Sequence, residues 1–213
     1  REFPTSEVSI AEILKPAGYS SAYFGKWHLG QGNPGQHGFD VHDGSTSNGT
    51  PGNEPAENPK DVYGLNQRAI DFMKKNVEDD RPFYVQLFHY AVHSPFTAHP
   101  KSLAKFEKLP KGKRHQDAVF AGMTWDLDVS IGTLRTEIEN LGIADNTYIV
   151  FLSDNGAGGG QRDGGLKNAP LNGGKSTLYE GGIRVPMIVA GPGIPANSHS
   201  KESVTGCDLY PTF

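Results

Sequence analysis

The sequence has almost no cysteine, since Cys207 is the only one in 213 residues. A lone thiol excludes an internal disulfide framework and a zinc site built from several cysteines. No apolar run is long enough to span a membrane, and residues 1–4 do not resemble a signal peptide. The charge is nearly balanced, with 20 Lys and Arg against 24 Asp and Glu, so we expect no general attraction to nucleic acid or to an anionic membrane.

Two nucleotide-binding motifs are incomplete. Residues 171–177 (LNGGKST) resemble a P-loop, but Ala169 stands where its first glycine is required. Residues 156–160 are rich in glycine and follow an apolar run, but Gln161 replaces the third glycine of a dinucleotide fingerprint. We therefore expect no nucleotide site.

What the sequence does contain is an alternation of helical and strand patterns. Helices are predicted over residues 9–18, 61–76 and 117–142, and strands over 19–24, 83–90, 148–152 and 185–190. The strand at 148–152 is apolar throughout, which is typical of a strand buried on both faces of a parallel sheet. We therefore predict an α/β fold with a mostly parallel central sheet, in a single domain over residues 1–213. Residues 30–60 are rich in Gly and Pro and are predicted to form a long surface loop.

Polar side chains follow three of the predicted strands. Lys26 and His28 come after the first strand, and His93 comes after the second. Asp154 and Asn155 follow the third, and ligands in such folds bind beyond the carboxyl ends of the strands. Carboxylate and amide oxygens suit Ca²⁺ or Mg²⁺, and lysines beside such a cation favour a tetrahedral oxyanion between them. A nearby histidine could then donate a proton to a poor leaving group.

Four segments resemble motif blocks of one enzyme family. Residues 18–30 (GYSSAYFGKWHLG) resemble the second sulfatase signature, and residues 93–95 (HSP), 153–156 (SDNG) and 174–186 (GKSTLYEGGIRVP) resemble further blocks in the same order. The resemblance is to the arylsulfatase-type, formylglycine-dependent sulfatases. It implies an alkaline-phosphatase-like three-layer sandwich, a sulfuric ester hydrolase activity, and a sulfated small molecule or glycan as substrate.

The resemblance also implies roles for four catalytic residues. Lys26 would contact the formylglycine and a sulfate oxygen, and His28 would help to expel the sulfate. His93 would act at the bridging oxygen as a general acid. Lys175 would contact the sulfate and leaving-group oxygens.

The implied cofactors are Ca²⁺, with Asp154 and Asn155 as two of its ligands, and formylglycine. The Cys/Ser-x-Pro-x-Arg motif that supplies formylglycine does not occur, and Cys207 lies in a different block, where we expect a small packing residue. The paired aspartates of the family's first strand are also missing. We therefore expect a catalytic domain that is incomplete at both ends, and an isolated chain that is inactive and binds Ca²⁺ weakly.

Several alternatives stay open at this point. The chain could belong to a phosphodiesterase or phosphonate hydrolase of the same superfamily, or to a non-catalytic paralogue that binds sulfated glycans. His89 and His99 compete with His93 for the role of general acid. Asp126 and Asp128, on the long helix, are expected to cap or to be solvated. Arg184 is expected to form an internal ion pair, with a role in the site as the alternative. The family suggests export to the periplasm, the cell exterior or the lysosome, and the oligomeric state is not predicted.

Overall fold

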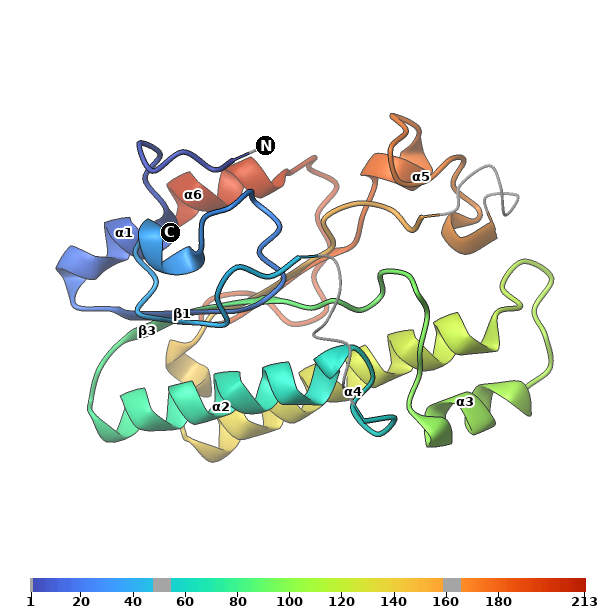
Figure 1. Ribbon diagram of the computed structural model, residues 1–213, viewed down its shortest axis with the longest axis horizontal. Coiled ribbons are helices and arrows are strands. Elements are labelled where there is room, and N and C mark those ends of the chain that lie inside the picture. The colour runs from blue at the N-terminus through green and yellow to red at the C-terminus, as the bar shows by residue number, and fades with distance from the viewer. Residues whose placement is uncertain (1, 48–54, 159–165) are drawn as a thin grey trace. The chain divides into compact units, whose positions relative to one another are not determined.

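The chain forms two compact units in the computed structural model, which describes residues 2–47, 55–158 and 166–213 (Figure 1). The first unit consists of Arg1–Lys108 and Ala118–Glu137, and the second of Leu109–Asp117 and Ile138–Phe213. A single domain over residues 1–213 stays a prediction.

A three-stranded parallel sheet forms the centre of the first unit. β1 (Ser20–Gly25) lies between β2 (Val41–His42) and β3 (Phe83–Phe88), and both neighbours run parallel to it. β1 and β3 run side by side in Figure 1, and their pairing ends with Gly25 opposite Phe88. The carboxyl ends of the first two predicted strands therefore lie next to each other at one edge of the sheet.

The first helix begins and ends where the sequence predicts. α1 (Ile10–Leu14) begins after Ser9, whose hydroxyl accepts from the Glu12 N–H at 3.1 Å, while the Glu12 carboxylate accepts from the Ser9 N–H at 2.8 Å. This capping box satisfies N–H groups that the helix itself leaves unpaired. The 3₁₀ turn η1 (Lys15–Ala17) follows, and Gly18 ends it in the left-handed conformation, with φ at 87°.

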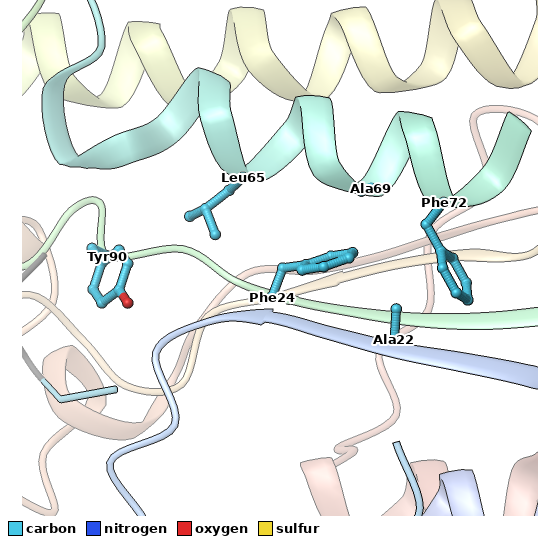
Figure 2. Packing of buried hydrophobic residues seen from close by; sticks show 6 residues of the cluster. All are labelled: Ala22, Phe24, Leu65, Ala69, Phe72 and Tyr90. Atoms are coloured by element: carbon cyan, nitrogen blue, oxygen red, sulfur yellow. The ribbon is translucent and has the colours of Figure 1, made fainter. Parts of the chain in front are cut away.

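One face of the sheet is covered by α2 (Val62–Glu78), which confirms the second predicted helix. Alternate residues of a strand point to the same face, so β1 presents two side chains to this helix. Figure 2 shows the resulting buried cluster: Ala22, Phe24, Leu65, Ala69, Phe72 and Tyr90. Full burial of a Leu or Phe side chain contributes about 1.5–3 kcal/mol, so this cluster is a main source of the unit's stability.

The opposite face of β1 packs against α1. Tyr23, Trp27 and Phe39 form a second buried cluster with Ala11 of α1. The Tyr23 ring meets the rings of Trp27 and Phe39 edge to face, with centroids 5.2 Å apart in both pairs. The first unit therefore has helix, sheet and helix layers, as an α/β sandwich requires.

Two more helices follow β3 in the sequence. α3 is Pro100–Glu107, and α4 is Ala118–Asn140, the long helix predicted from its apolar stripe. The N–H of Gly142, at φ 69°, donates to the Glu139 carbonyl oxygen at 3.0 Å just beyond the end of α4. Within residues 2–47, 55–158 and 166–213, no helix combines the length and the apolar character needed to cross a membrane.

The second unit contains a two-stranded sheet and short helices. β4 (Ile149–Leu152) pairs antiparallel with β5 (Met187–Ala190). The expectation that this apolar strand pairs in parallel is wrong for this sheet, because an apolar run indicates burial and not strand direction. The remaining elements are the 3₁₀ turns η4 (Ala144–Asn146), η5 (Leu166–Asn168) and η6 (Gly206–Asp208) and the helices α5 (Glu180–Ile183) and α6 (Leu209–Thr212).

The prediction that residues 30–60 form only a surface loop is also wrong. This segment contains η2 (Pro34–His37) and β2, and it ends in η3 (Pro59–Asp61). Pro34, His37 and Phe39 are buried. The high Gly and Pro content favours a loop prediction even though a few side chains of the segment reach the core. Residues 48–54 of the segment lie outside the described residues.

Candidate functional site

Lys26 and His28 follow β1 on either side of a buried tryptophan. Trp27 is only 5% exposed, while Lys26 is half-buried and His28 is exposed. The Lys26 N–H donates to the Phe88 carbonyl oxygen at 2.9 Å, which attaches the segment to the end of β3. His28 has a positive φ of 45°, a conformation that few residues other than glycine adopt. Burial of Trp27 therefore anchors the segment that carries both polar side chains at the edge of the sheet.

His93 lies in the turn that follows β3. Its N–H donates to the Tyr90 carbonyl oxygen at 2.9 Å, and its Nδ1 lies 2.7 Å from the Ser94 carbonyl oxygen. A carbonyl oxygen can only accept, so we assign the ring proton to Nδ1 in this contact. Nε2 is then the ring nitrogen that can take up or release a second proton.

The two competing histidines have different environments. Burial lowers the pKa of His89 to about 4, although the negative charge of Asp61 opposes the shift, so this ring is neutral near pH 7. His99 caps α3, and its Nδ1 accepts from the Lys101 N–H at 3.1 Å. The choice of His93 among the three histidines as the general acid stays a prediction.

Asp154 and Asn155 form the loop that follows β4. The Ser153 hydroxyl donates to the Asn155 carbonyl oxygen at 2.9 Å, and the Asn155 side-chain NH₂ donates to the Gly156 carbonyl oxygen at 3.0 Å. The second bond orients the amide, because its NH₂ group is engaged and its Oδ1 stays available as an acceptor. Asp154 is exposed, so this loop offers carboxylate and amide oxygens together.

A second loop of the same unit holds Lys175 beside the first. The Lys175 N–H donates to the Ala157 carbonyl oxygen at 3.1 Å. The Asn168 side chain connects the two loops, since it accepts from the Ala157 N–H at 2.8 Å and donates to the Gly173 carbonyl oxygen at 3.1 Å. The glycine-rich segment that resembles a P-loop is therefore a packed loop that places Lys175 near the residues after β4.

The predicted site residues thus form two groups. Lys26, His28 and His93 lie in the first unit, in segments that leave neighbouring parallel strands. Asp154, Asn155 and Lys175 lie in the second unit, on loops bonded to each other. That all six serve one site stays a prediction.

The oxygen donors of the second unit fit part of a calcium shell. Ca²⁺ takes about six to eight oxygen ligands, and Asp154 and Asn155 supply oxygens of the right kind. In the part of the chain that the structure describes, no three His, Cys, Asp or Glu side chains gather closely enough to hold a metal ion. The oxygens of Asp154 and Asn155 are therefore of the kind that would hold Ca²⁺.

Three residues outside the motifs hold the segment that carries Lys26. Asp43 accepts from the Gly25 N–H at 2.8 Å, and the Thr46 hydroxyl accepts from the Trp27 N–H at 2.7 Å. Arg68 reaches Asp43 from α2 at 3.0 Å. No sequence pattern identifies these residues, because only the folded chain brings them to the end of β1.

Asp126 is a buried acceptor and is not solvated. Asp126 is only 1% exposed. Its carboxylate accepts from the His99 N–H at 2.7 Å, the Tyr63 hydroxyl at 3.1 Å and the Ser102 hydroxyl at 2.5 Å. Asp126 lies inside α4 and the N-cap of α3 is His99, so both the capping and the solvated expectation are wrong: the carboxylate is a buried acceptor that joins α4 to α2 and α3. Burial, followed by the charge and hydrogen bond of Asp126, raises the pKa of Tyr63 to about 12.

Two smaller expectations concern Arg184 and Cys207. Arg184 pairs with Glu180 at 3.1 Å, which confirms an ion pair, although both side chains are largely exposed. Cys207 is exposed in η6, so the interpretation as a packing residue is wrong. An exposed thiol gains no packing energy, and the sequence around it had no apolar periodicity that could have indicated burial.

Comparison with known proteins gives a consistent family match. The family described as Sulfatase matches residues 1–213. The chain is 33% identical over 242 residues to N-acetylgalactosamine-6-sulfatase of Canis lupus familiaris, which covers 98% of this chain and 44% of that protein. It is 31% identical over 249 residues to human arylsulfatase A, with 99% and 47% covered. The chain therefore spans about half the length of the curated relatives it matches.

The fold is also found in solved structures. The crystal structure of Ps i-CgsB in complex with k-i-k-neocarrahexaose matches with a TM-score of 0.83 and 28% identity. The match covers 100% of this chain and 53% of that one. This similarity confirms the predicted α/β fold of the alkaline-phosphatase-like type.

Proposed function

Because this chain belongs to the sulfatase family, we propose that it is part of a catalytic domain that hydrolyses sulfate esters. The observation that carries the proposal is the anchored segment with Lys26 and His28, which leaves β1 beside the end of β3 in a chain that the family matches throughout. The chain would supply residues that bind the sulfate group and transfer protons.

The two lysines are proposed to bind the oxygens of the sulfate group. As the bond between sulfur and the bridging oxygen breaks, negative charge grows on the departing oxygen. Lys26 and Lys175 are both half-buried, and a fixed cation in a partly desolvated site stabilises such charge more than it would in water. Lys175 is proposed to contact the leaving-group oxygen as well.

His93 is proposed to donate the proton that the leaving group needs. An alkoxide is a poor leaving group, and protonation at the bridging oxygen lowers the barrier to its departure. With Nδ1 bonded to the Ser94 carbonyl oxygen, the proton would be delivered from Nε2. His28, exposed beyond Trp27, is proposed to assist the release of sulfate.

Of the two cofactors that the family implies, the residues of this chain suit Ca²⁺ but not formylglycine. When bound, Ca²⁺ would offset negative charge on the sulfate group, and Asp154 and Asn155 would hold it through their oxygens. For formylglycine the residues do not fit, because the family's Cys/Ser-x-Pro-x-Arg motif is absent and Cys207 belongs to a different block. The 213 residues therefore supply no formylglycine nucleophile to the proposed reaction.

The proposed substrates are sulfated small molecules or sulfated glycans. Support comes from the names of the relatives, one an N-acetylgalactosamine-6-sulfatase and one solved with k-i-k-neocarrahexaose. Export to the periplasm, the cell exterior or the lysosome is part of the same proposal.

The test is an assay of the natural gene product that contains these 213 residues, with matched aryl sulfate, aryl phosphate and phosphonate esters. We expect sulfate ester hydrolysis, and a loss of roughly 100-fold or more in kcat/KM for Lys26→Ala and for Lys175→Ala. Lys111→Ala, which removes an exposed lysine outside both groups, is the control and should retain activity.

The outcomes separate the alternatives. Faster hydrolysis of the phosphate or phosphonate ester would replace the proposal with the related hydrolases. Binding of a sulfated glycan without hydrolysis of any ester would favour the non-catalytic paralogue. Equal activity of the Lys26→Ala and Lys111→Ala proteins would contradict the role of Lys26.

A further inference from the structure

Thr46 makes three hydrogen bonds to the segment that carries Lys26 and His28. Its hydroxyl donates to the Gly25 carbonyl oxygen at 2.5 Å and accepts from the Trp27 N–H at 2.7 Å. Its carbonyl oxygen accepts from the His28 N–H at 2.9 Å. A hydroxyl has one proton and two lone pairs, so a single side chain can make both of the first two bonds at once.

Three further backbone groups of the segment are also hydrogen-bonded. The Lys26 N–H donates to the Phe88 carbonyl oxygen at 2.9 Å, and the Lys26 carbonyl oxygen accepts from the Tyr23 hydroxyl at 2.7 Å. The Gly25 N–H donates to Asp43 at 2.8 Å. Every N–H from residue 25 to residue 28 therefore has an acceptor outside the segment, which fixes its path between the two polar side chains.

The loop that carries Thr46 is itself attached to α2. Asp43 accepts from Nη2 of Arg68 at 3.0 Å, and the same nitrogen donates to Asp61 at 2.7 Å. Burial by itself would lower the pKa of Arg68, but the hydrogen bonds to Asp61 and Asp43 raise it, so the guanidinium stays charged. These charge-assisted bonds connect the loop to the helix that packs on β1.

We propose that Thr46 is a positioning residue for Lys26 and His28, and that Asp43 and Arg68 hold its loop in place. The inference rests on the proposed sulfatase function. Without the hydroxyl, the Gly25 carbonyl oxygen and the Trp27 N–H would lose their shared partner, and the segment could shift. A displacement of about 1 Å is enough to cost roughly 100-fold in rate at a catalytic site.

The experiment is Thr46→Val in the complete natural protein, compared with two other variants. Valine keeps the shape of threonine and the backbone bond to His28, but it removes the hydroxyl bonds to Gly25 and Trp27 and the side-chain bond with Tyr90. We expect kcat to fall roughly 10- to 100-fold with a smaller change in KM, and we expect Thr46→Ser to restore most of it. Ser45→Ala is the matched control, because the Ser45 hydroxyl donates to the Gly32 carbonyl oxygen at 2.6 Å and is not bonded to residues 25–28.

Amide hydrogen exchange at Trp27 and His28 gives a readout that does not depend on activity. Exchange at Trp27 should be faster in Thr46→Val than in Thr46→Ser or Ser45→Ala. Equal loss of kcat in Thr46→Val and Ser45→Ala, or no rescue by serine, would overturn the proposal. If the wild-type protein hydrolyses no sulfate ester, the proposed function fails, and unchanged Trp27 exchange in Thr46→Val would then refute the positioning role separately.

Discussion

Acidification should destabilise the first unit through His89. Among residues 2–47, 55–158 and 166–213, its buried Nδ1 has no hydrogen-bond partner, and burial lowers the pKa of the ring from 6.5 to about 4, while Asp61 opposes the shift. The folded state therefore favours the neutral ring. A pKa of about 4 in the folded state against 6.5 in the unfolded chain corresponds to a free energy of about 3 kcal/mol.

The sign follows from which state binds the proton first. As the pH falls below 6.5, the unfolded chain takes up a proton at His89 while the folded protein does not, so the free energy of unfolding decreases. The decrease ends near pH 4, where the folded protein is protonated as well. Between pH 7.5 and pH 4.5 the contribution of His89 to this loss should be about 2.5 kcal/mol.

Urea unfolding at the two pH values measures this loss, with tryptophan fluorescence as the probe, since Trp27 and Trp125 both belong to the first unit. His89→Gln replaces the ring with a side chain that does not titrate. The variant should lose about 2.5 kcal/mol less than the wild type between the two pH values, because the other titrating groups contribute equally to both proteins. His115→Gln, which removes an exposed histidine, should behave like the wild type. An equal loss in wild type and His89→Gln would refute the reasoning.

Two further predictions concern the stability of the first unit. Asp126→Asn should lower the free energy of unfolding, measured by urea titration, by about 3 kcal/mol, because an NH₂ group would face hydrogen-bond donors in a buried site. Asp128→Asn, at an exposed position of the same helix, is the control and should change it by about 0.5 kcal/mol or less. Equal effects of these two variants would contradict the structural role of Asp126. Gly25→Ala should lower the midpoint of thermal unfolding more than Gly18→Ala does. Both glycines have a positive φ, so alanine is strained at either position. Only at Gly25 would the new Cβ also clash with the Phe88 carbonyl oxygen, because Gly18 faces open space. Similar midpoints would contradict the close approach of Gly25 to the Phe88 carbonyl oxygen.

Local signals in the sequence were sufficient for most helices and strands. The capping box of Ser9 and Glu12 and the stop at Gly18 depend on residues a few positions apart, so they can be recognised without the fold. The same holds for the apolar stripe of α4 and for the aromatic strand β3. The antiparallel pairing of β4 with β5 and the burial of His37 depend on partners far along the chain, and the sequence predicts neither, although the parallel direction of β1, β2 and β3 is confirmed.

The residue types of the candidate site were recognisable from the sequence because lysines, histidines and an Asp-Asn pair follow strands in a fixed order. That order does not decide between His93 and His89, because His89 lies at the end of the predicted strand 83–90 and His93 lies just beyond it. Only burial in the folded chain separates them: it lowers the pKa of His89, while the His93 ring bonds to Ser94.

For most elements the sequence by itself determined where a helix or strand begins and which chemical groups follow it, because these depend on neighbours within a turn or a strand; α3 and β2 are exceptions. Only the tertiary structure decided that Thr46, Asp43 and Arg68 hold the backbone beside Lys26. The physical reason is that a hydrogen bond requires two groups to meet within about 3 Å. For groups separated by many residues, that meeting depends on how sheet, helix and loop pack, which no local pattern specifies.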